Sequence, residues 1–327
     1  MNPNFIFHNQ NRFCVAPMLS YTDEFCNYFH RKLTKKSILY TEMMTTKYIL
    51  NKKNILKKKL CNPIAIQIAG SNIVELVKCA KISYNQGYHE INLNIGCPSK
   101  SAKAGMFGVF LMQHSTLVIQ IVKAINNSIP TPISIKTRIG INHKDNYSFL
   151  SDFIHKISTN TLCKTFIIHA RNAFTNIYSP KKNRSLPTLK YNIVYRIKQE
   201  FPHLNIVING GITTIKESIS HLKKVDGVML GQEVYKNPSL LRKVDEKIFK
   251  YPKKQKLNNV QLLYSMFPYI NKQITNGIPI YKITRHMLGL FKGEKGYKQW
   301  KKYLMQESYK KNANINVLEK AMKFIHI

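Results

Sequence analysis

The fold prediction starts from residues 205–231, which read NIVINGGITTIKESISHLKKVDGVMLG. Two short runs rich in apolar and β-branched residues, Asn205–Asn209 and Gly227–Leu230, have the character of buried strands. Between them Thr214 and Glu217 have the spacing of a capping box at the start of a helix. A strand, a helix and a second strand in this order form the repeating unit of a parallel sheet.

The same alternation extends over about 230 residues. Six further runs have the same strand character: Phe13–Pro17, Ile38–Glu42, Ile64–Ile68, Glu90–Asn94, Ile133–Thr137 and Thr165–His169. Helical spacing of apolar residues follows at Asn72–Tyr84, Leu117–Ile125 and Thr214–Leu222. Eight strands alternating with helices predict a (β/α)8 TIM barrel. A doubly wound sheet is the alternative, but it usually carries a GxGxxG turn, and the sequence contains none.

The pattern changes near Phe249–Lys256, where a proline and a lysine cluster interrupt it. Helices are predicted after it, at Val260–Ile274, Ile280–Phe291, Gly296–Tyr309 and Val317–Ile325. We therefore predict a barrel domain over residues 1–250 and a smaller, all-helical bundle over residues 251–327.

Composition limits the class of protein. The 327 residues are 44% hydrophobic, and no apolar run approaches the length of a membrane helix. The N-terminus lacks the pattern of a secretory signal, and the six cysteines show neither a CxxC pair nor metal-ligand spacing. We therefore expect a cytoplasmic protein with free thiols, no metal site and no membrane association.

Charge indicates a polyanionic partner. The net charge is +35, and residues 252–327 are the more densely positive part, with 15 basic and 3 acidic side chains. Such a field attracts nucleic acid. Only 8 of the 51 basic residues are arginine, and asparagine and isoleucine are abundant, so an AT-rich genome accounts for part of the excess.

Polar residues and glycines follow the predicted strands, at the barrel face that carries active sites. Gly210-Gly211 and Gly231 come after the last two strands, where barrels commonly bind a phosphate group. Lys136 lies within an apolar strand, where its charge requires an anionic partner. That partner is either a reduced flavin ring or an interior carboxylate such as Glu42. His169 is either a hydrogen-bond donor to a phosphate or ring atom or a structural residue of the core.

Cys97 differs from the other cysteines because it lies between a glycine and a proline just beyond a strand. Cys14, Cys79 and Cys163 fall in apolar patterns and are predicted to be core residues. A free thiol has a pKa of about 8.5 and is mostly protonated near neutral pH. Cys97 is therefore a candidate proton donor rather than a nucleophile.

Several motifs resemble the bacterial tRNA-dihydrouridine synthases, in particular the A type, which acts on uridines 20 and 20a of the D-loop. The motifs run along nearly the whole chain: APMLSYTD at 16–23, LYTEMMTT at 39–46, GYHEINLNIGCPS at 87–99, GMFG at 105–108, KTRIGI at 136–141, FIIHARNA at 166–173, SPKKNR at 179–184, NGGI at 209–212, DGVMLG at 226–231 and ITRHMLGLF at 283–291.

The resemblance implies an FMN enzyme in which NADPH reduces the flavin, hydride passes to C6 of a uracil, and Cys97 protonates C5. It also implies which residues contact each ligand. The residues that match cofactor-binding positions are Pro17, Met18, Gln67, Lys136, His169, Asn209, Gly210, Gly211, Gly231 and Gln232. The residues that match tRNA-binding positions are Asn94, Lys181, Arg184, Lys298 and Lys301. A monomer is the expected state.

Some positions depart from the family pattern. Ser20 and Tyr21 replace an aspartate and a tryptophan, Gln232 stands where arginine is common, and Lys298 and Lys301 stand where we expect arginine. Ser20 and Tyr21 should alter packing, and the charge lost at Gln232 should weaken FMN binding. At positions 298 and 301 lysine keeps the charge but loses the planar fork of arginine, so all these changes bear on affinity rather than on the reaction. Two alternatives are a flavin barrel enzyme acting on a small molecule and a tRNA-binding protein without catalysis.

Overall fold

The computed structural model describes residues 10–51, 61–144, 146–251 and 257–326. The chain forms two compact units. The first consists of the described residues of Met1–Leu19 and Ser37–Leu230, and the second of Ser20–Lys36 with those of Gly231–Ile327. The segment Ser20–Lys36 and the residues from Gly231 to 250 therefore join the second unit, although the predicted functional boundary lies at residue 250. The assignment of cofactor binding to residues 1–250 and of tRNA binding to 251–327 stays a prediction.

The first unit is a TIM barrel, as predicted. Its eight parallel strands are β1 (Phe13–Val15), β2 (Leu39–Thr45), β3 (Ile64–Ala69), β4 (Glu90–Ile95), β5 (Ile133–Arg138), β6 (Thr165–His169), β7 (Asn205–Asn209) and β8 (Gly227–Leu230). Each strand pairs with its neighbours, and β1 pairs with β8. The barrel closes through a parallel bridge between Cys14 and Ile38, supported by the hydrogen bond from Val15 N to Ile38 O at 2.9 Å.

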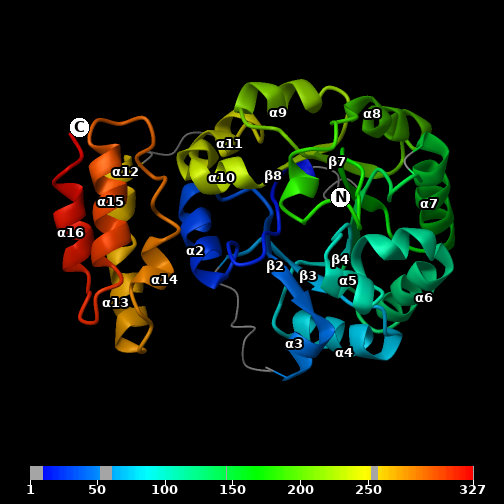
Figure 1. Ribbon diagram of the computed structural model, residues 1–327, viewed down its shortest axis with the longest axis horizontal. Helices are drawn as coiled ribbons and strands as arrows, with labels where there is room; N and C mark the ends of the chain where they lie inside the picture. The colour runs from blue at the N-terminus through cyan, green and yellow to red at the C-terminus, as the bar shows by residue number, and fades with distance from the viewer. Residues whose placement is uncertain (1–9, 52–60, 145, 252–256, 327) are drawn as a thin grey trace. The chain divides into compact units, whose positions relative to one another are not determined.

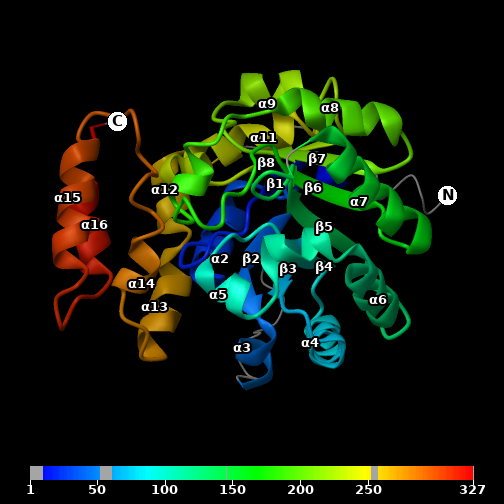
Figure 2. The same cartoon turned by 45° about the vertical axis from the view of Figure 1, so that its right-hand side comes forward.

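Helices surround these strands (Figures 1 and 2). They are α3 (Thr46–Asn51), α4 (Ile73–Asn85), α5 (Lys100–Ala104), α6 (Ser115–Asn126), α7 (Tyr147–Asn160), α8 (Tyr191–Glu200) and α9 (Ile215–His221). The three helices predicted from apolar spacing correspond to α4, α6 and α9. The capping box is confirmed, because the Thr214 side chain accepts from Glu217 N and the Glu217 carboxylate accepts from Thr214 N.

The barrel interior divides into an apolar part and a polar part. The apolar part is a cluster of buried side chains: Cys14, Ala16, Ile38, Tyr40, Ala65, Ile167, Val207 and Met229. The polar part contains Glu90, Asn92 and Ser134, all less than 5% exposed. Cys14, Cys79 and Cys163 are buried, as predicted, while Cys97 is half-buried.

The second unit is helical. Its helices are α2 (Glu24–Leu33), α10 (Gln232–Lys236), α11 (Leu241–Lys247), α12 (Asn259–Tyr264), α13 (Phe267–Thr275), α14 (Tyr281–Thr284), α15 (Tyr297–Glu307) and α16 (Asn316–Met322). The single helix predicted at Val260–Ile274 is wrong: Pro268 opens a second helix, α13, because its ring cannot continue a preceding one. The helix predicted at Ile280–Phe291 continues beyond α14 only as turns. No helix in the described part of the chain is long and apolar enough to cross a membrane.

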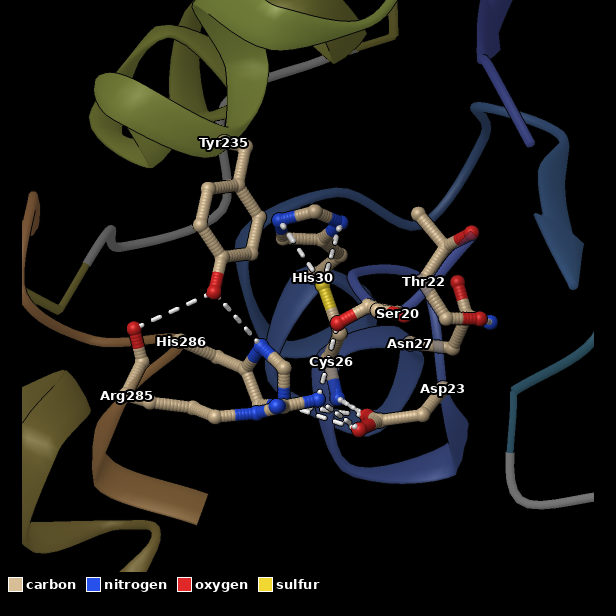
Figure 3. Close-up of polar contacts among 9 residues, drawn as sticks. All are labelled: Ser20, Thr22, Asp23, Cys26, Asn27, His30, Tyr235, Arg285 and His286. Carbon is tan, nitrogen blue, oxygen red and sulfur yellow. Dashed lines mark hydrogen bonds and ion pairs between the residues drawn. The ribbon is translucent and has the colours of Figure 1, made fainter. Parts of the chain in front are cut away.

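Two of the motifs meet within the second unit (Figure 3). Asp23 of APMLSYTD caps α2 by accepting from Cys26 N at 2.9 Å. The same carboxylate binds Arg285 of ITRHMLGLF at 2.7 Å and His286 at 3.0 Å, and Tyr235 Oη lies 3.1 Å from Nδ1 of His286. Both motifs therefore have a structural role in holding α2.

Candidate active site

Cys97 lies on a tight loop beyond β4. Its Sγ–H donates to Ser99 Oγ at 3.3 Å, and its backbone N–H donates to Asn94 Oδ1 at 3.0 Å. Gly108, in the GMFG motif, packs against the same loop with φ +65°, and a Cβ there would lie 2.4 Å from Cys97 O. Val109 N donates to that oxygen at 3.0 Å. The loop is thus held from both sides while the thiol stays half-exposed.

Lys136 projects from β5 beside Asn94, its register partner on β4. Its Nζ donates to Asn209 Oδ1 at 3.1 Å, and the Asn209 amide donates in turn to Met229 O at 2.7 Å. Burial, together with the charge of Arg138, lowers the pKa of Lys136 to about 7. The alternative ion pair with Glu42 is not among the contacts of Lys136 in the described part of the chain.

His169 ends β6 and is buried. Among the described residues, its Nε2 has no hydrogen-bond partner. Burial and the charges of Arg138 and Lys136 lower its pKa well below the usual value, so the imidazole is neutral near pH 7. A Cβ on Gly210, which has φ +114°, would lie 3.0 Å from the His169 ring, so glycine keeps this ring in place.

Arg138, two residues after Lys136, is a functional residue that the sequence pattern alone did not single out. Its side chain is 4% exposed and donates to three carbonyl oxygens, those of Gly96, Asn172 and Asn183, each at 3.0 Å. Arg138 therefore ties the Cys97 loop to the segments after β6. The signal was available in KTRIGI, where a second cation follows an apolar strand.

Asn183 holds the loop that carries two of the predicted tRNA contacts. Its amide donates to the carbonyl oxygens of Phe174 at 2.9 Å and Tyr178 at 2.8 Å and accepts from Phe174 N at 2.8 Å. Lys181 and Arg184 are exposed on either side of this anchor. The loop presents both cations to solvent on a fixed backbone.

The structure brings together part of the predicted site. Residues on β3 to β7 and the loops after them lie at one end of the barrel: Gln67, Asn94, Cys97, Lys136, His169, Asn209, Gly210 and Gly211. Pro17 and Met18, both half-buried, follow β1 in the same unit. Gly231 and Gln232 start α10, and Lys298 and Lys301 are exposed on α15, so these four belong to the second unit and their roles stay predictions.

The barrel residues have the donor set that a flavin requires. The free Nε2 of His169, the Lys136 ammonium and the Gln67 and Asn94 amides can meet the polar edge and negative charge of an isoalloxazine ring. A Cβ on Gly211 would lie 2.5 Å from Leu189 Cδ1, so the glycines after β7 also serve packing. The Nε2 of His169, which has no partner among the described residues, and the desolvated lysine favour a ligand at this place.

The chain is similar to known proteins along nearly its whole length. A family model described as Dihydrouridine synthase (Dus) matches residues 14–326. The tRNA-dihydrouridine(20/20a) synthase of Escherichia coli (strain K12) is 45% identical over 320 residues, which cover 97% of this chain and 92% of that protein. The enzyme of the same name from Pasteurella multocida (strain Pm70) is 44% identical over 318 residues, 97% of each chain.

Two solved structures share the fold. A 2-naphthoyl-CoA reductase complex superposes with a TM-score of 0.56 at 10% identity, covering 72% of this chain and 50% of that one. A histamine dehydrogenase from Rhizobium sp. 4-9 superposes with a TM-score of 0.53 at 14% identity, covering 78% of this chain and 49% of that one.

Proposed function

Since the chain belongs to the dihydrouridine synthase family, we propose that it is a flavin-dependent oxidoreductase that reduces uridines 20 and 20a in the D-loop of tRNA. FMN is the proposed cofactor and NADPH the reductant. The observation that carries the proposal is the group of Cys97, Lys136 and His169 at one end of the barrel, with the His169 Nε2 unpartnered among the described residues. Most buried polar atoms in folded proteins have a hydrogen-bond partner, so this nitrogen favours a ligand at the site.

Cys97 is the proposed general acid. Reduction of the uracil C5=C6 bond needs a hydride at C6 and a proton at C5. FMN supplies the hydride when bound. The Cys97 Sγ–H supplies the proton, and its hydrogen bond to Ser99 shows that the thiol can act as a donor. The bond from Cys97 N to Asn94 Oδ1 and the bond from Val109 N to Cys97 O hold the loop, and with it Sγ, in a defined position.

The remaining barrel residues are proposed to hold the cofactor. Lys136 faces negative charge on the ring, and a bound anion favours its protonated form. His169 Nε2 forms a hydrogen bond with the ring or the phosphate. The other proposed cofactor contacts are Pro17, Met18, Gln67, Asn209, Gly210, Gly211, Gly231 and Gln232.

Binding of tRNA is proposed to use exposed cations and one amide. The proposed contacts are Asn94, Lys181, Arg184, Lys298 and Lys301. Lysine and arginine contacts to phosphates set affinity and register rather than base identity. The target uracil must leave its stack to reach the end of the barrel, and a D-loop nucleotide does so at lower cost than a nucleotide in a duplex.

An anaerobic flavin experiment tests the proposal. The purified protein, supplied with FMN, is reduced with NADPH, freed of excess reductant and mixed with tRNA that lacks dihydrouridine. Return of the oxidised flavin band with this tRNA, but not with fully modified tRNA, is the expected result. A flavin that is reduced but does not respond to tRNA would indicate a small-molecule dehydrogenase. Absence of flavin binding would leave only RNA binding.

A further inference from the structure

A continuous chain of hydrogen bonds runs from the Cys97 loop into the barrel interior. Every donor in it points the same way, away from Cys97 and toward the carboxylate of Glu90. In order, Cys97 N donates to Asn94 Oδ1 (3.0 Å), Asn94 Nδ2 to Gln67 Oε1 (2.8 Å), Gln67 Nε2 to Asn92 Oδ1 (2.7 Å), Asn92 Nδ2 to Ser134 Oγ (2.7 Å), and Ser134 Oγ to Glu90 Oε1.

Strand register makes this chain possible. Gln67 on β3 is the register partner of Asn92 on β4, and Asn92 is the register partner of Ser134 on β5. Glu90, Asn92 and Asn94 alternate along β4, so their side chains share the interior face of the barrel. Three neighbouring strands therefore place one amide or hydroxyl beside the next without a gap.

The two ends of the chain impose the same direction on it. At one end, the backbone N–H groups of Gly96 and Cys97 can only donate, so Asn94 must present its oxygen to them. At the other end, Glu90 is 4% exposed, and burial raises its pKa. The hydrogen bonds from Ser134, Tyr40 and Asn11 oppose this rise and favour the ionised form, which can only accept. Each amide between the ends then has one orientation that satisfies both neighbours.

We propose that Glu90 is a positioning residue for the reaction: by accepting from Ser134, it fixes the orientation of the Gln67 and Asn94 amides and, through Asn94, the backbone of the Cys97 loop. This inference rests on the proposed function, because Gln67, Asn94 and Cys97 have their roles there. Glu90 itself touches neither tRNA nor cofactor in this scheme.

The chain offers a matched pair of variants. Ser134 and Tyr40 are both buried, and each donates a hydroxyl hydrogen bond to the same oxygen, Glu90 Oε1. Of these two residues, only Ser134 belongs to the chain of hydrogen bonds between Glu90 and Cys97. Ser134→Ala and Tyr40→Phe thus remove the same kind of bond at similar burial, but only Ser134→Ala breaks the connection to the loop.

Two measurements are made on both variants and on the wild type. The first measures separately the rate of flavin reduction by NADPH and the rate of flavin reoxidation by tRNA. The second, on protein without FMN, follows alkylation of Cys97 by iodoacetamide through peptide mass spectrometry. We expect Ser134→Ala to slow reoxidation about tenfold, the effect of one lost buried hydrogen bond, with reduction unchanged. We expect it to speed Cys97 alkylation, because the loop loses its fixed anchor, and Tyr40→Phe to match the wild type in both.

Substitutions of Glu90 give an independent check. The Asn11 side chain also bonds to Glu90, and its Oδ1 is unpartnered among the described residues. Glu90→Gln can therefore keep its oxygen toward Ser134 and donate its amide to Asn11, and it should behave as the wild type. Glu90→Leu, which cannot accept, should behave as Ser134→Ala.

The outcomes separate the inference from the proposed function. Equal effects of Ser134→Ala and Tyr40→Phe, or no effect of Ser134→Ala on either readout, would overturn the positioning role. Failure of tRNA to reoxidise the wild-type flavin would overturn the proposed function, and the alkylation rates would still decide whether Glu90 orients the Cys97 loop.

Discussion

Replacing Lys136 with methionine should stabilise the protein without FMN, and the gain should depend on pH. The pKa of Lys136 is about 7 in the fold against 10.5 for an ordinary lysine. Between pH 7 and pH 10.5 Lys136 is protonated in the unfolded chain but not in the folded protein, so wild-type stability rises with pH through this window. Below about pH 7 the folded protein carries the full cost of burying the charge. At 1.36 kcal/mol for each pH unit the cost reaches about 5 kcal/mol.

Two effects reduce the expected gain. Methionine loses the hydrogen bond to Asn209, worth about 1 kcal/mol, and partial exposure of the lysine screens its charge. We therefore expect Lys136→Met to be more stable than the wild type by about 2–3 kcal/mol at pH 6, with the difference shrinking as pH rises to 9.

Urea unfolding followed by circular dichroism between pH 6 and pH 9 measures this difference. Lys81→Met is the control, because Lys81 is exposed on α4 and its removal should leave the pH trend unchanged. Added FMN should stabilise the wild type more than Lys136→Met, because the lysine then faces an anion. A stability difference that stays constant from pH 6 to pH 9 would refute the burial of a charge at this position.

Three further predictions concern Cys97, the two lysines of α15 and Asp23. Cys97→Ala should retain FMN binding and its reduction by NADPH but lose most dihydrouridine formation, measured by nucleoside analysis of tRNA; unchanged formation would exclude the acid role. Lys298→Glu with Lys301→Glu should weaken tRNA binding and flatten its salt dependence, measured by filter binding at several salt concentrations; a wild-type slope would place the docking surface elsewhere. Burial would raise the pKa of Asp23, but bonds from His286, Cys26 N and Arg285 outweigh it and lower the pKa. Asp23→Asn should therefore destabilise the protein by about 1–3 kcal/mol at pH 7 in urea unfolding. This difference should shrink as pH falls below about 4, where Asp23 of the unfolded wild-type chain takes up a proton before the folded one does.

The pattern of apolar residues was sufficient to predict all the strands but only some of the helices. All eight predicted strands are present, because buried parallel strands are continuous apolar runs. Helix α2 was not predicted, although Phe25, Phe29 and Leu33 have helical spacing and are buried. Helix α7 was overlooked although Leu150, Phe153, Ile154 and Ile157 have helical spacing.

The candidate site was predictable where a residue is conspicuous by itself. Cys97 stands between glycine and proline, and Lys136 is a cation in an apolar strand. The hydrogen-bond chain behind them was not predictable, because Gln67, Asn92 and Ser134 come together only through the register of three strands. A shift of one residue in one strand would turn its side chain to the other face of the sheet.

The buried cations and the histidine at the end of the barrel indicate that this end binds a ligand. Burial lowers the pKa values of three cations, Lys136, Arg138 and Arg171. The burial of each charge therefore reduces the stability of the folded protein. The neutral His169 among them keeps one nitrogen unpartnered within the described structure. Arg138 offsets its burial by donating to three carbonyl oxygens, which holds the loops together. Lys136 donates to a single amide oxygen, and His169 Nε2 has no partner among the described residues. Costs that the chain itself leaves uncompensated are best explained by an anionic ligand, and this is why FMN should raise the stability of the wild type more than that of Lys136→Met.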